Sequence, residues 1–362
     1  MSTTPPPIGG PFLKKSLTVQ QIMMVVMLAL TPATMYGLFQ FGWPAVYLFL
    51  VTVGSALVFE ALWLKMAGRP IAPALSDGSA ALTGWLLAMT LPPWAPWWIG
   101  VLGSLIAIWL GKQVFGGVGQ NLFNPAMVAR VVLLISFPVH MTFFVDPSPI
   151  LNTGAPGFME SLAVTFGFGT APAMDAVSSA SVLGYLKTEV GRGNEWLQVF
   201  NNSYDMQSVL MGAVPGSLGE TSAPLILLGG ALLLALRIIS WHIPVAMIGT
   251  LAVLATLFNF SNPMAYPSAA IHVLSGATLL GAFFIATDLV TSPVSPLGKL
   301  VFGFGCGLLV YVIRTWAGYP EGLAFAVLIM NAATPLIDRY TRPRVYGRDR
   351  KGEPLAAEEG AQ

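Results

Sequence analysis

Charged residues are scarce in this chain of 362 residues, at only 9%, whereas 55% of its residues are hydrophobic. A soluble globular domain carries about 25% charged residues, so the chain lacks the polar groups that would cover a water-facing surface of its size. The high apolar content also excludes an intrinsically disordered chain. The composition predicts a polytopic membrane protein.

Other absences narrow the functional classes. The formal net charge of +1 gives no basic excess for a nucleic-acid partner. One cysteine, Cys306, excludes a disulfide framework and an iron–sulfur cluster held by this chain alone. The three histidines (His140, His242 and His272) fall at the ends of apolar runs without metal-ligand spacing, so no metal site is expected. A strand–Gly-x-Gly-x-x-Gly–helix unit is missing as well, so the chain has no NADH site of its own.

Long apolar runs are what the sequence does contain. Crossing a bilayer takes about 20 apolar residues, and the runs lack the alternation of a membrane barrel. The N-terminal run follows Lys14 and Lys15 and has no convincing cleavage site, so it is not expected to be a signal peptide. The prediction is an all-α protein with ten transmembrane helices, at about 19–40, 43–64, 78–92, 96–115, 122–145, 223–240, 243–260, 268–289, 297–316 and 320–338.

The basic residues predict the orientation. With the N-terminus inside, only Lys187 and Arg192 fall in outer segments, and Arg130 and Arg314 lie within predicted spans. The remaining Lys and Arg residues are on the inner side, including Lys112 in an inner loop, as the positive-inside rule requires. Both termini are therefore predicted to be cytoplasmic, in a bacterial inner membrane, with a basic cytoplasmic tail at 341–362.

A long polar segment, residues 146–222, is predicted to lie on the periplasmic face. It could be a passive linker, but structureless loops of this length are uncommon and are often functional. It separates an N-terminal five-helix repeat, residues 1–145, from a C-terminal one, residues 223–340. An odd number of spans in each half makes the two repeats inverted, as in many transporters.

A weak internal echo accompanies this arrangement. Residues 84–90 (Gly-Trp-Leu-Leu-Ala-Met-Thr) are similar to residues 281–287 (Gly-Ala-Phe-Phe-Ile-Ala-Thr), each in the third run of its half and each followed by prolines. Proline-interrupted spans at matching positions point to a site near the membrane midplane. Chance similarity between two apolar stretches is the alternative.

Residues 175–181 (Asp-Ala-Val-Ser-Ser-Ala-Ser) combine one carboxylate, Asp175, with three hydroxyls, at Ser178, Ser179 and Ser181. On composition alone this is an ordinary polar turn.

A glycine-rich stretch holds the second group of candidates. Gly116 and Gly117 precede a predicted helix start at Asn121 to Pro125, and Asn121 and Asn124 are spaced to share one side of a helical turn. Helix N-termini bind anionic or polar ligands, and glycines allow close approach. The alternative is a helix cap with close packing.

Charged residues within predicted spans form the third group of candidates: Glu60, Arg130, Asp288 and Arg314. Charges in lipid are costly, so each is a functional candidate. Alternatively, the arginines are structural counter-ions of the acids, and Asp288 could lie at the cytoplasmic edge.

Several of these motifs together resemble a known family. Residues 175–181 are similar to the flavin-attachment motif Asp-x-x-Ser/Thr-Gly/Ala/Ser-Ala-Thr/Ser, with Ser181 where threonine is usual. Further matching motifs are Phe59-Glu60, Pro92-Pro93, the glycine–asparagine stretch 116–126, and Ala286-Thr287-Asp288. Over about residues 15–345 the chain resembles the D subunits of Rnf electron-transport complexes, and their relatives, the B subunits of sodium-pumping NADH:quinone reductases.

The resemblance implies the cofactors and their sites. FMN would be joined to Ser181 by a phosphoester, and a noncovalent riboflavin would lie near Asn121 and Asn124, whose amides offer donors and acceptors. Glu60 and Asp288 match acidic positions linked to cation uptake, which implies an ion pathway.

The implied function is that of a flavin-bearing membrane subunit in a redox-driven translocase that moves electrons between NADH and ferredoxin and couples this to Na⁺ or H⁺ movement. It would not be active alone. The implied partners are the other Rnf subunits (A, B, C, E and G), a flavin transferase and membrane lipids, with no nucleic acid. A small-solute channel or transporter of inverted-repeat type is the main alternative, and a quinone-reducing subunit is a third.

Overall fold

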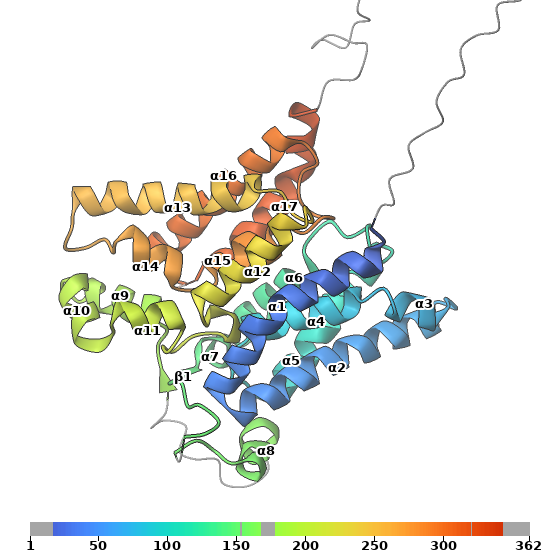
Figure 1. The fold of residues 1–362 in the computed structure, drawn as a ribbon, viewed down its shortest axis with the longest axis horizontal. Helices are drawn as coiled ribbons and strands as arrows, with labels where there is room; N and C mark the ends of the chain where they lie inside the picture. The colour runs from blue at the N-terminus through green and yellow to red at the C-terminus, as the bar shows by residue number, and fades with distance from the viewer. Residues whose placement is uncertain (1–16, 153, 168–177, 320, 343–362) are drawn as a thin grey trace, which may run out of the picture.

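The fold is helical, with one very short strand pair among the residues described. The computed structural model describes residues 17–152, 154–167, 178–319 and 321–342. Figure 1 shows that the start of α1 and the end of α17 lie at one end of the molecule, whereas α8 to α11 lie towards the other.

The N-terminal half contains two long helices followed by shorter pieces. Thr18 caps the first helix, because its Oγ1 accepts from Gln21 N at 3.2 Å while Gln21 Oε1 accepts from Thr18 N at 3.0 Å. The π-helical turn η1 continues directly from α5. The elements are α1 (Val19–Phe41), α2 (Trp43–Met66), α3 (Ile71–Leu75), α4 (Ser79–Thr90), α5 (Trp97–Leu105), η1 (Ile106–Leu110), η2 (Gln113–Phe115), α6 (Pro125–Ser136) and α7 (Pro138–Thr142).

The segment between the halves folds into short elements with an apolar core of its own. Val182, Leu186, Trp196 and Phe200 are buried in that core, and it packs against Ile271 of the second half. The predicted polar loop is thus partly a small helical layer. Its elements are β1 (Phe144–Val145), α8 (Phe158–Phe166), β2 (Ser178–Ser179), α9 (Val182–Gly191), α10 (Trp196–Ser203), α11 (Met206–Met211) and η4 (Leu218–Glu220).

The C-terminal half again has long helices and a broken third stretch. That stretch, over 269–285, consists of two short helices and the π-helical turn η5. π-helical turns are rare and occur frequently at functional sites. The elements are α12 (Ala223–Ala235), α13 (His242–Ser261), α14 (Ala269–Leu274), α15 (Thr278–Leu280), η5 (Gly281–Ile285), α16 (Pro296–Trp316) and α17 (Leu323–Tyr340).

Within the described part of the chain, five helical segments are long and apolar enough to cross a membrane: 19–41, 43–66, 97–115, 242–261 and 296–316. They expose large apolar side chains such as Leu28, Leu50 and Leu257, as lipid-facing helices do. Other predicted spans contain shorter helices; α4 and α6 have 12 residues each, or about 18 Å of helix against a hydrocarbon core of about 30 Å. The multi-pass helical character is confirmed, while the count of ten and the inverted repeat stay predictions.

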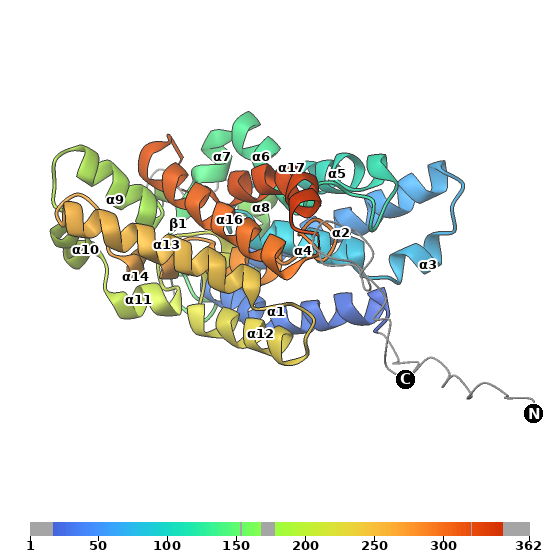
Figure 2. The ribbon, with the colours of Figure 1, turned by 90° about the horizontal axis from the view of Figure 1, so that it is seen from above.

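The two halves meet through their first and last helices. α1 packs against α12, and α6 packs against α17, and Figure 2 shows α1 and α12 side by side from a second direction. Gly229 of α12 lies directly against the backbone carbonyl of Ala29 in α1, and Gly230 lies against Phe283. Small residues allow this close approach, which is the usual way that helices associate in membranes.

Candidate functional site

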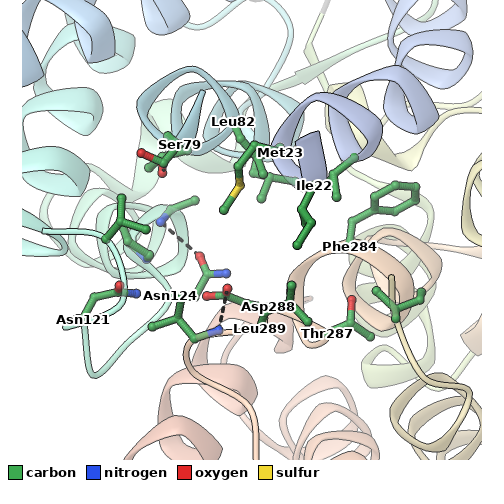
Figure 3. Close-up of a pocket in the computed structure, with 18 of the residues that line it drawn as sticks. Ile22, Met23, Ser79, Leu82, Asn121, Asn124, Phe284, Thr287, Asp288 and Leu289 are labelled. Carbon is green, nitrogen blue, oxygen red and sulfur yellow. Dashed lines mark hydrogen bonds between the residues drawn. The ribbon is translucent and has the colours of Figure 1, made fainter. Parts of the chain in front are cut away.

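A cavity lies between the two halves of the chain. It encloses about 790 Å³, counted out to its open side. The N-terminal half contributes α1, α4 and the turn before α6, and the C-terminal half contributes α12, η5 and the turn after η5 (Figure 3). Most lining side chains are apolar. The polar ones are Ser79, Thr83, Lys112, Asn121, Asn124, Thr287 and Asp288.

Asn124 closes one wall of this first cavity and joins the halves. It is the N-cap of α6, with Oδ1 accepting from Ala126 N at 3.1 Å and Met127 N at 3.3 Å. Asparagine at the N-cap followed by proline at the first helical position is a strong helix start. Its Nδ2 donates to the carbonyl oxygen of Ile285 in η5 at 3.5 Å. A single side chain therefore starts α6 and holds it against the second half.

Asn121 lies in the irregular segment before this helix start. Its Nδ2 donates to the carbonyl oxygen of Phe123 at 3.1 Å, and the residue is buried. The helix begins at Pro125, so the prediction that Asn121 and Asn124 share a helical turn is wrong; Asn121 precedes the cap that Asn124 provides. Both side chains nevertheless line the same cavity (Figure 3).

The glycines before Asn121 shape the turn without lining the cavity. Gly116 and Gly117 have φ angles of +119° and +104°, which side chains rarely adopt. The Gly116 carbonyl accepts from Arg69 Nη1 at 3.1 Å. Val118, which follows Gly117, is the residue of this turn that lines the cavity. Gly116 and Gly117 thus position the turn, and neither is among the residues that line the first cavity.

Asp288 enters the first cavity from the second half, just after η5. Its Oδ1 accepts from Val290 N at 3.2 Å and its Oδ2 accepts from Thr291 Oγ1 at 3.0 Å. Among the described residues, no salt bridge to Asp288 is found. The carboxylate is half-buried and is held by the two local hydrogen bonds, so it has capacity left for a cation.

Glu60 belongs to a buried cluster beside the same cavity. Lys112 Nζ lies 2.8 Å from Glu60 Oε1 and 2.7 Å from Ser79 Oγ, and both charged side chains are 2% exposed. Gln113 Nε2 donates to the same Oε1 at 2.7 Å. Glu60 Oε2 and Gln113 Oε1 are buried without a partner among the described residues. Lys112 and Ser79 line the cavity, so they connect Glu60 to it.

The two intramembrane arginines lie apart from Glu60 and Asp288. Arg314 Nη2 forms a salt bridge of 2.7 Å with Glu321 Oε2, and the guanidinium also donates to the carbonyl oxygen of His272. The idea that the arginines are counter-ions of Glu60 and Asp288 is wrong, because the partner of Glu60 is Lys112. Lys112 is also buried rather than part of an exposed inner loop.

Ser181 lines a second cavity, which is smaller than the first and has about 370 Å³ of empty space when the open solvent at its mouth is counted. Ser178 and Ser179 form β2, which pairs antiparallel with Val145 and Phe144 of β1. Ser181 then caps α9, its Oγ accepting from Gly184 N at 3.3 Å, and it is 9% exposed. The charged residues that line this cavity with it are Arg130, Glu220 and Glu321. Asp175 lies outside the described residues.

Lys187 fixes α9 to the end of α16. Its Nζ donates to the carbonyl oxygens of Arg314 at 2.8 Å and Tyr319 at 3.3 Å, and also to that of Ala317. A cation at a helix C-terminus satisfies free carbonyls and complements the helix dipole. Burial lowers the pKa of Lys187 from its ordinary value. This attachment sets where α9, and Ser181 at its start, lie against the second half.

Comparison with known proteins gives the family. A family model described as the NQR2, RnfD, RnfE family matches residues 8–347. The chain belongs to this family. It is 53% identical over 351 residues to a protein of Halorhodospira halophila (97% of this chain, 98% of the relative). It is 54% identical over 340 residues to one of Stutzerimonas stutzeri (94% and 95%) and 44% identical over 353 residues to one of Escherichia coli O157:H7 (95% and 98%). Each relative is named as the D subunit of an ion-translocating oxidoreductase complex.

In this member of the NQR2, RnfD, RnfE family, the predicted site residues lie at two separate cavities. Asn121, Asn124 and Asp288 line the first cavity, and Glu60 reaches it through Lys112 and Ser79. Ser181 lines the second cavity. Among the described residues, no group of three or more His, Cys, Asp or Glu side chains could hold a metal ion, and Cys306 is buried and free.

Sequence reasoning missed Lys112, Glu220 and Glu321 as site residues. Lys112 lies near the end of the fourth apolar run, where it looks like an ordinary inner-side cation, and Glu220 looks like one more acid of a polar loop. The signal that could have found Lys112 is its position near the cytoplasmic end of the fourth run, at the same depth as Glu60 in the second. Two opposite charges at one depth in neighbouring spans favour each other in lipid.

Proposed function

We propose that the chain is the D subunit of a bacterial ion-translocating oxidoreductase complex, an electron-transport translocase of the inner membrane that moves electrons between NADH and ferredoxin. The names of relatives that are 44–54% identical over nearly the whole chain support the assignment to such a complex. The observation that carries the role of this chain is the first cavity, where two amides and an acid from opposite halves meet among apolar walls.

The first cavity suits a noncovalent riboflavin. Ligand sites are mostly apolar with a few placed polar groups, and Leu82, Leu86 and Phe284 supply apolar walls. Asn121 and Asn124 supply amides that could face the pyrimidine edge of an isoalloxazine ring. The protein would bind and orient the ring and exclude water from it; a flavin bound here would supply the redox chemistry.

Ser181 is the proposed attachment point of FMN. In the attachment, Ser181 Oγ forms a bond to the phosphorus of the FMN half of FAD, the phosphorus–oxygen bond to the AMP half breaks, AMP leaves and the hydroxyl proton passes to solvent. A flavin transferase would catalyse this step on the periplasmic face. Ser181 is mostly buried, so the segment around β2 has to open for the transferase before it packs.

Glu60 and Asp288 are the proposed ion-pathway residues. They border the same cavity from opposite halves, one paired with Lys112 and one without a cationic partner among the described residues. A carboxylate near a bound flavin changes its affinity for Na⁺ or a proton when the charge of the flavin changes. Electrons would pass to the partner subunits (A, B, C, E and G), since the sequence lacks the dinucleotide-binding unit that an NADH site would need.

Flavin attachment is tested by mass spectrometry and in-gel fluorescence of the denatured chain, co-expressed with its transferase. We expect the parent and Ser181→Thr to fluoresce, and Ser181→Ala to lose both the fluorescence and the added mass of FMN. Ser178→Ala, three residues away in β2, is the matched control and should keep both. Undiminished fluorescence in Ser181→Ala would place the attachment at another residue.

The cavity is tested separately through noncovalent flavin. Asn121→Ala should lower the riboflavin released by acid denaturation while covalent fluorescence stays at the parental level, because Asn121 lines only the first cavity. Glu60→Gln and Asp288→Asn should keep their flavins but lower ion-linked transport in membrane vesicles. Transport at the parental rate in both variants would make these acids purely structural.

A small-solute transporter is the second candidate, since the cavity lies between two halves of the chain. It predicts a purified chain without any flavin. A quinone-reducing subunit predicts instead that the assembled complex reduces a soluble quinone. Flavin content and quinone reduction therefore separate the three functions.

A further inference from the structure

Arg130 has an unfulfilled hydrogen-bonding group in the second cavity. The residue sits in the second turn of α6, is 6% exposed, and lines this cavity together with Ser181. Its Nη1 is buried and has no hydrogen-bond partner among the described residues. A buried guanidinium without full hydrogen bonding is costly, so a buried donor of this kind indicates a missing acceptor.

The two acids that line this cavity with Arg130 form hydrogen bonds and ion pairs with other residues. Glu321 Oε2 pairs with Arg314 at 2.7 Å, and Glu321 Oε1 accepts from the backbone nitrogens of Gly322 and Leu323. Glu220 Oε1 accepts from Ser217 Oγ at 2.7 Å. Burial and the nearby negative charge of Glu321 raise the pKa of Glu220, against the opposing influence of Arg130.

The ion pairing of the second cavity follows from these contacts. Arg314 pairs with Glu321, and among the described residues neither Glu220 nor Glu321 forms a salt bridge with Arg130. The missing acceptor of Arg130 Nη1 can therefore be a group that is bound in the cavity. A phosphodiester carries one negative charge, and a guanidinium donates to phosphate oxygens in a fork that an ammonium cannot reproduce.

We propose that Arg130 binds the phosphate of the flavin nucleotide esterified to Ser181, so that the second cavity is the binding site of this phosphodiester. The proposal rests on the covalent attachment argued above. It gives Arg130 a positioning role: the guanidinium holds the phosphate, and through it the start of α9, against α6. The flavin ring itself is free to reach beyond the cavity.

The test is a double-mutant cycle on the full-length chain, co-expressed with its transferase and purified in detergent. The thermal unfolding midpoint is measured for the parent, Arg130→Gln, Ser181→Ala and the double variant, and in-gel fluorescence reports the flavin in each. We expect Arg130→Gln to lower the midpoint by a few degrees more in the flavinylated chain than in the Ser181→Ala background. Arg192→Gln is the control arginine, because Arg192 is exposed and both it and its ion-pair partner Glu189 are outside the second-cavity lining, so its effect should be the same in both backgrounds.

A spectroscopic readout covers the case in which Arg130→Gln does not fold or acquires no flavin. The ³¹P resonance of the phosphodiester should move in Arg130→Lys, which keeps the charge but loses the paired N–H donors of the guanidinium, and should stay in place in Arg192→Lys. If the losses in the unfolding midpoint were additive, or if the resonance did not move in Arg130→Lys, Arg130 would not bind the phosphate. The covalent attachment of the flavin would still stand. A parent chain without fluorescence would contradict both the covalent attachment at Ser181 and the binding of the phosphate by Arg130.

Discussion

Glu60 and Lys112 form an ion pair that is almost completely removed from solvent, with both side chains 2% exposed. Each charge alone would be expensive in that environment, and removing one partner of a buried pair costs about 3–5 kcal/mol. Ser79 and Gln113 share the cost by hydrogen bonding to the pair. The pair is therefore a strong local constraint between α2 and the end of the fourth apolar segment.

The first prediction concerns this pair. Lys112→Met leaves the Glu60 carboxylate buried without its cation and should lower the free energy of unfolding by about 3 kcal/mol. The double variant Glu60→Gln/Lys112→Met removes both charges and should lose much less than the sum of the two single changes. Unfolding is followed by the reaction of Cys306 with a thiol-reactive dye during heating, because this thiol is fully buried in the folded chain. Additive losses would show that the two groups do not interact.

The second prediction is a pH dependence that comes from Glu220. Its pKa is raised in the folded chain, chiefly by burial, so below its ordinary pKa of about 4.3 the residue is protonated in both states. As the pH rises, the unfolded chain releases this proton first, and the folded chain loses stability until the raised pKa is passed. Glu220→Gln cannot titrate. The parent should therefore lose stability relative to Glu220→Gln as the pH rises above about 4.5, measured as the difference between their unfolding midpoints.

Helix ends decide where the candidate residues are placed. Asn124 ends a glycine-rich turn and starts α6, Ser181 starts α9, and Ser295 Oγ accepts from Gly298 N at 2.9 Å at the start of α16. Each is a residue type favoured at N-caps. Because these caps border the cavities or the elements that form them, the local sequence signals of helix starts also locate the sites.

At the contact between α1 and α12, Gly229 should be intolerant of any side chain. A Cβ there would collide with the backbone carbonyl of Ala29, which cannot move without shifting α1. Overpacking of this kind typically costs about 1–3 kcal/mol, so Gly229→Ala should lower the unfolding midpoint. Gly249→Ala on α13 is the matched control, because nothing lies within 4 Å of the added Cβ. Equal midpoints for both variants would argue against close packing of α1 on α12.

The attachment of α9 to α16 through Lys187 gives a fourth prediction. Lys187→Met loses the donor to three backbone carbonyls at the end of α16. The start of α9 should then be held less firmly against α16 in the flavinylated chain, and the segment around Ser181 should be more accessible to protease. Arg192→Met is the control, because Arg192 pairs only with Glu189 at the surface of the same helix, where ion pairs contribute little. Limited proteolysis with in-gel fluorescence of the fragments measures the difference. Identical digestion of the two variants would contradict a role for Lys187.

The orientation of the whole molecule is testable with the same thiol chemistry. Because Cys306 is buried, single cysteines introduced at exposed serines are the only reactive ones. Ser203→Cys in α10 should react with a membrane-impermeant maleimide in intact spheroplasts, and Ser76→Cys after α3 should react only after lysis. Both positions are exposed in the structure. The reverse pattern would invert the predicted topology.

The sequence predicts the helical membrane class and the regions of the two sites, but not their internal contacts. Apolar runs and positive-inside charge are local signals, and capping residues such as Asn124 are local too. The pairing of Glu60 with Lys112, 52 residues apart, depends on how α2 packs on the fourth segment. The gathering of Arg130 with Glu220 and Glu321 depends on three distant segments folding together. Such long-range contacts cannot be obtained from spacing along one chain.

The helix α6 carries one cavity at its first turn and the other at its second. Asn124 and Arg130 are six residues apart, or about 9 Å along the helix axis. If α6 runs along the membrane normal and each cavity holds one flavin, an electron that moves between them crosses about a third of a hydrocarbon core of about 30 Å. Its electrical work is then about 0.7 kcal/mol per 100 mV. A diffusion potential of about 100 mV across vesicles should therefore shift the distribution of electrons between the two flavins about threefold, and no shift would place both flavins at one depth.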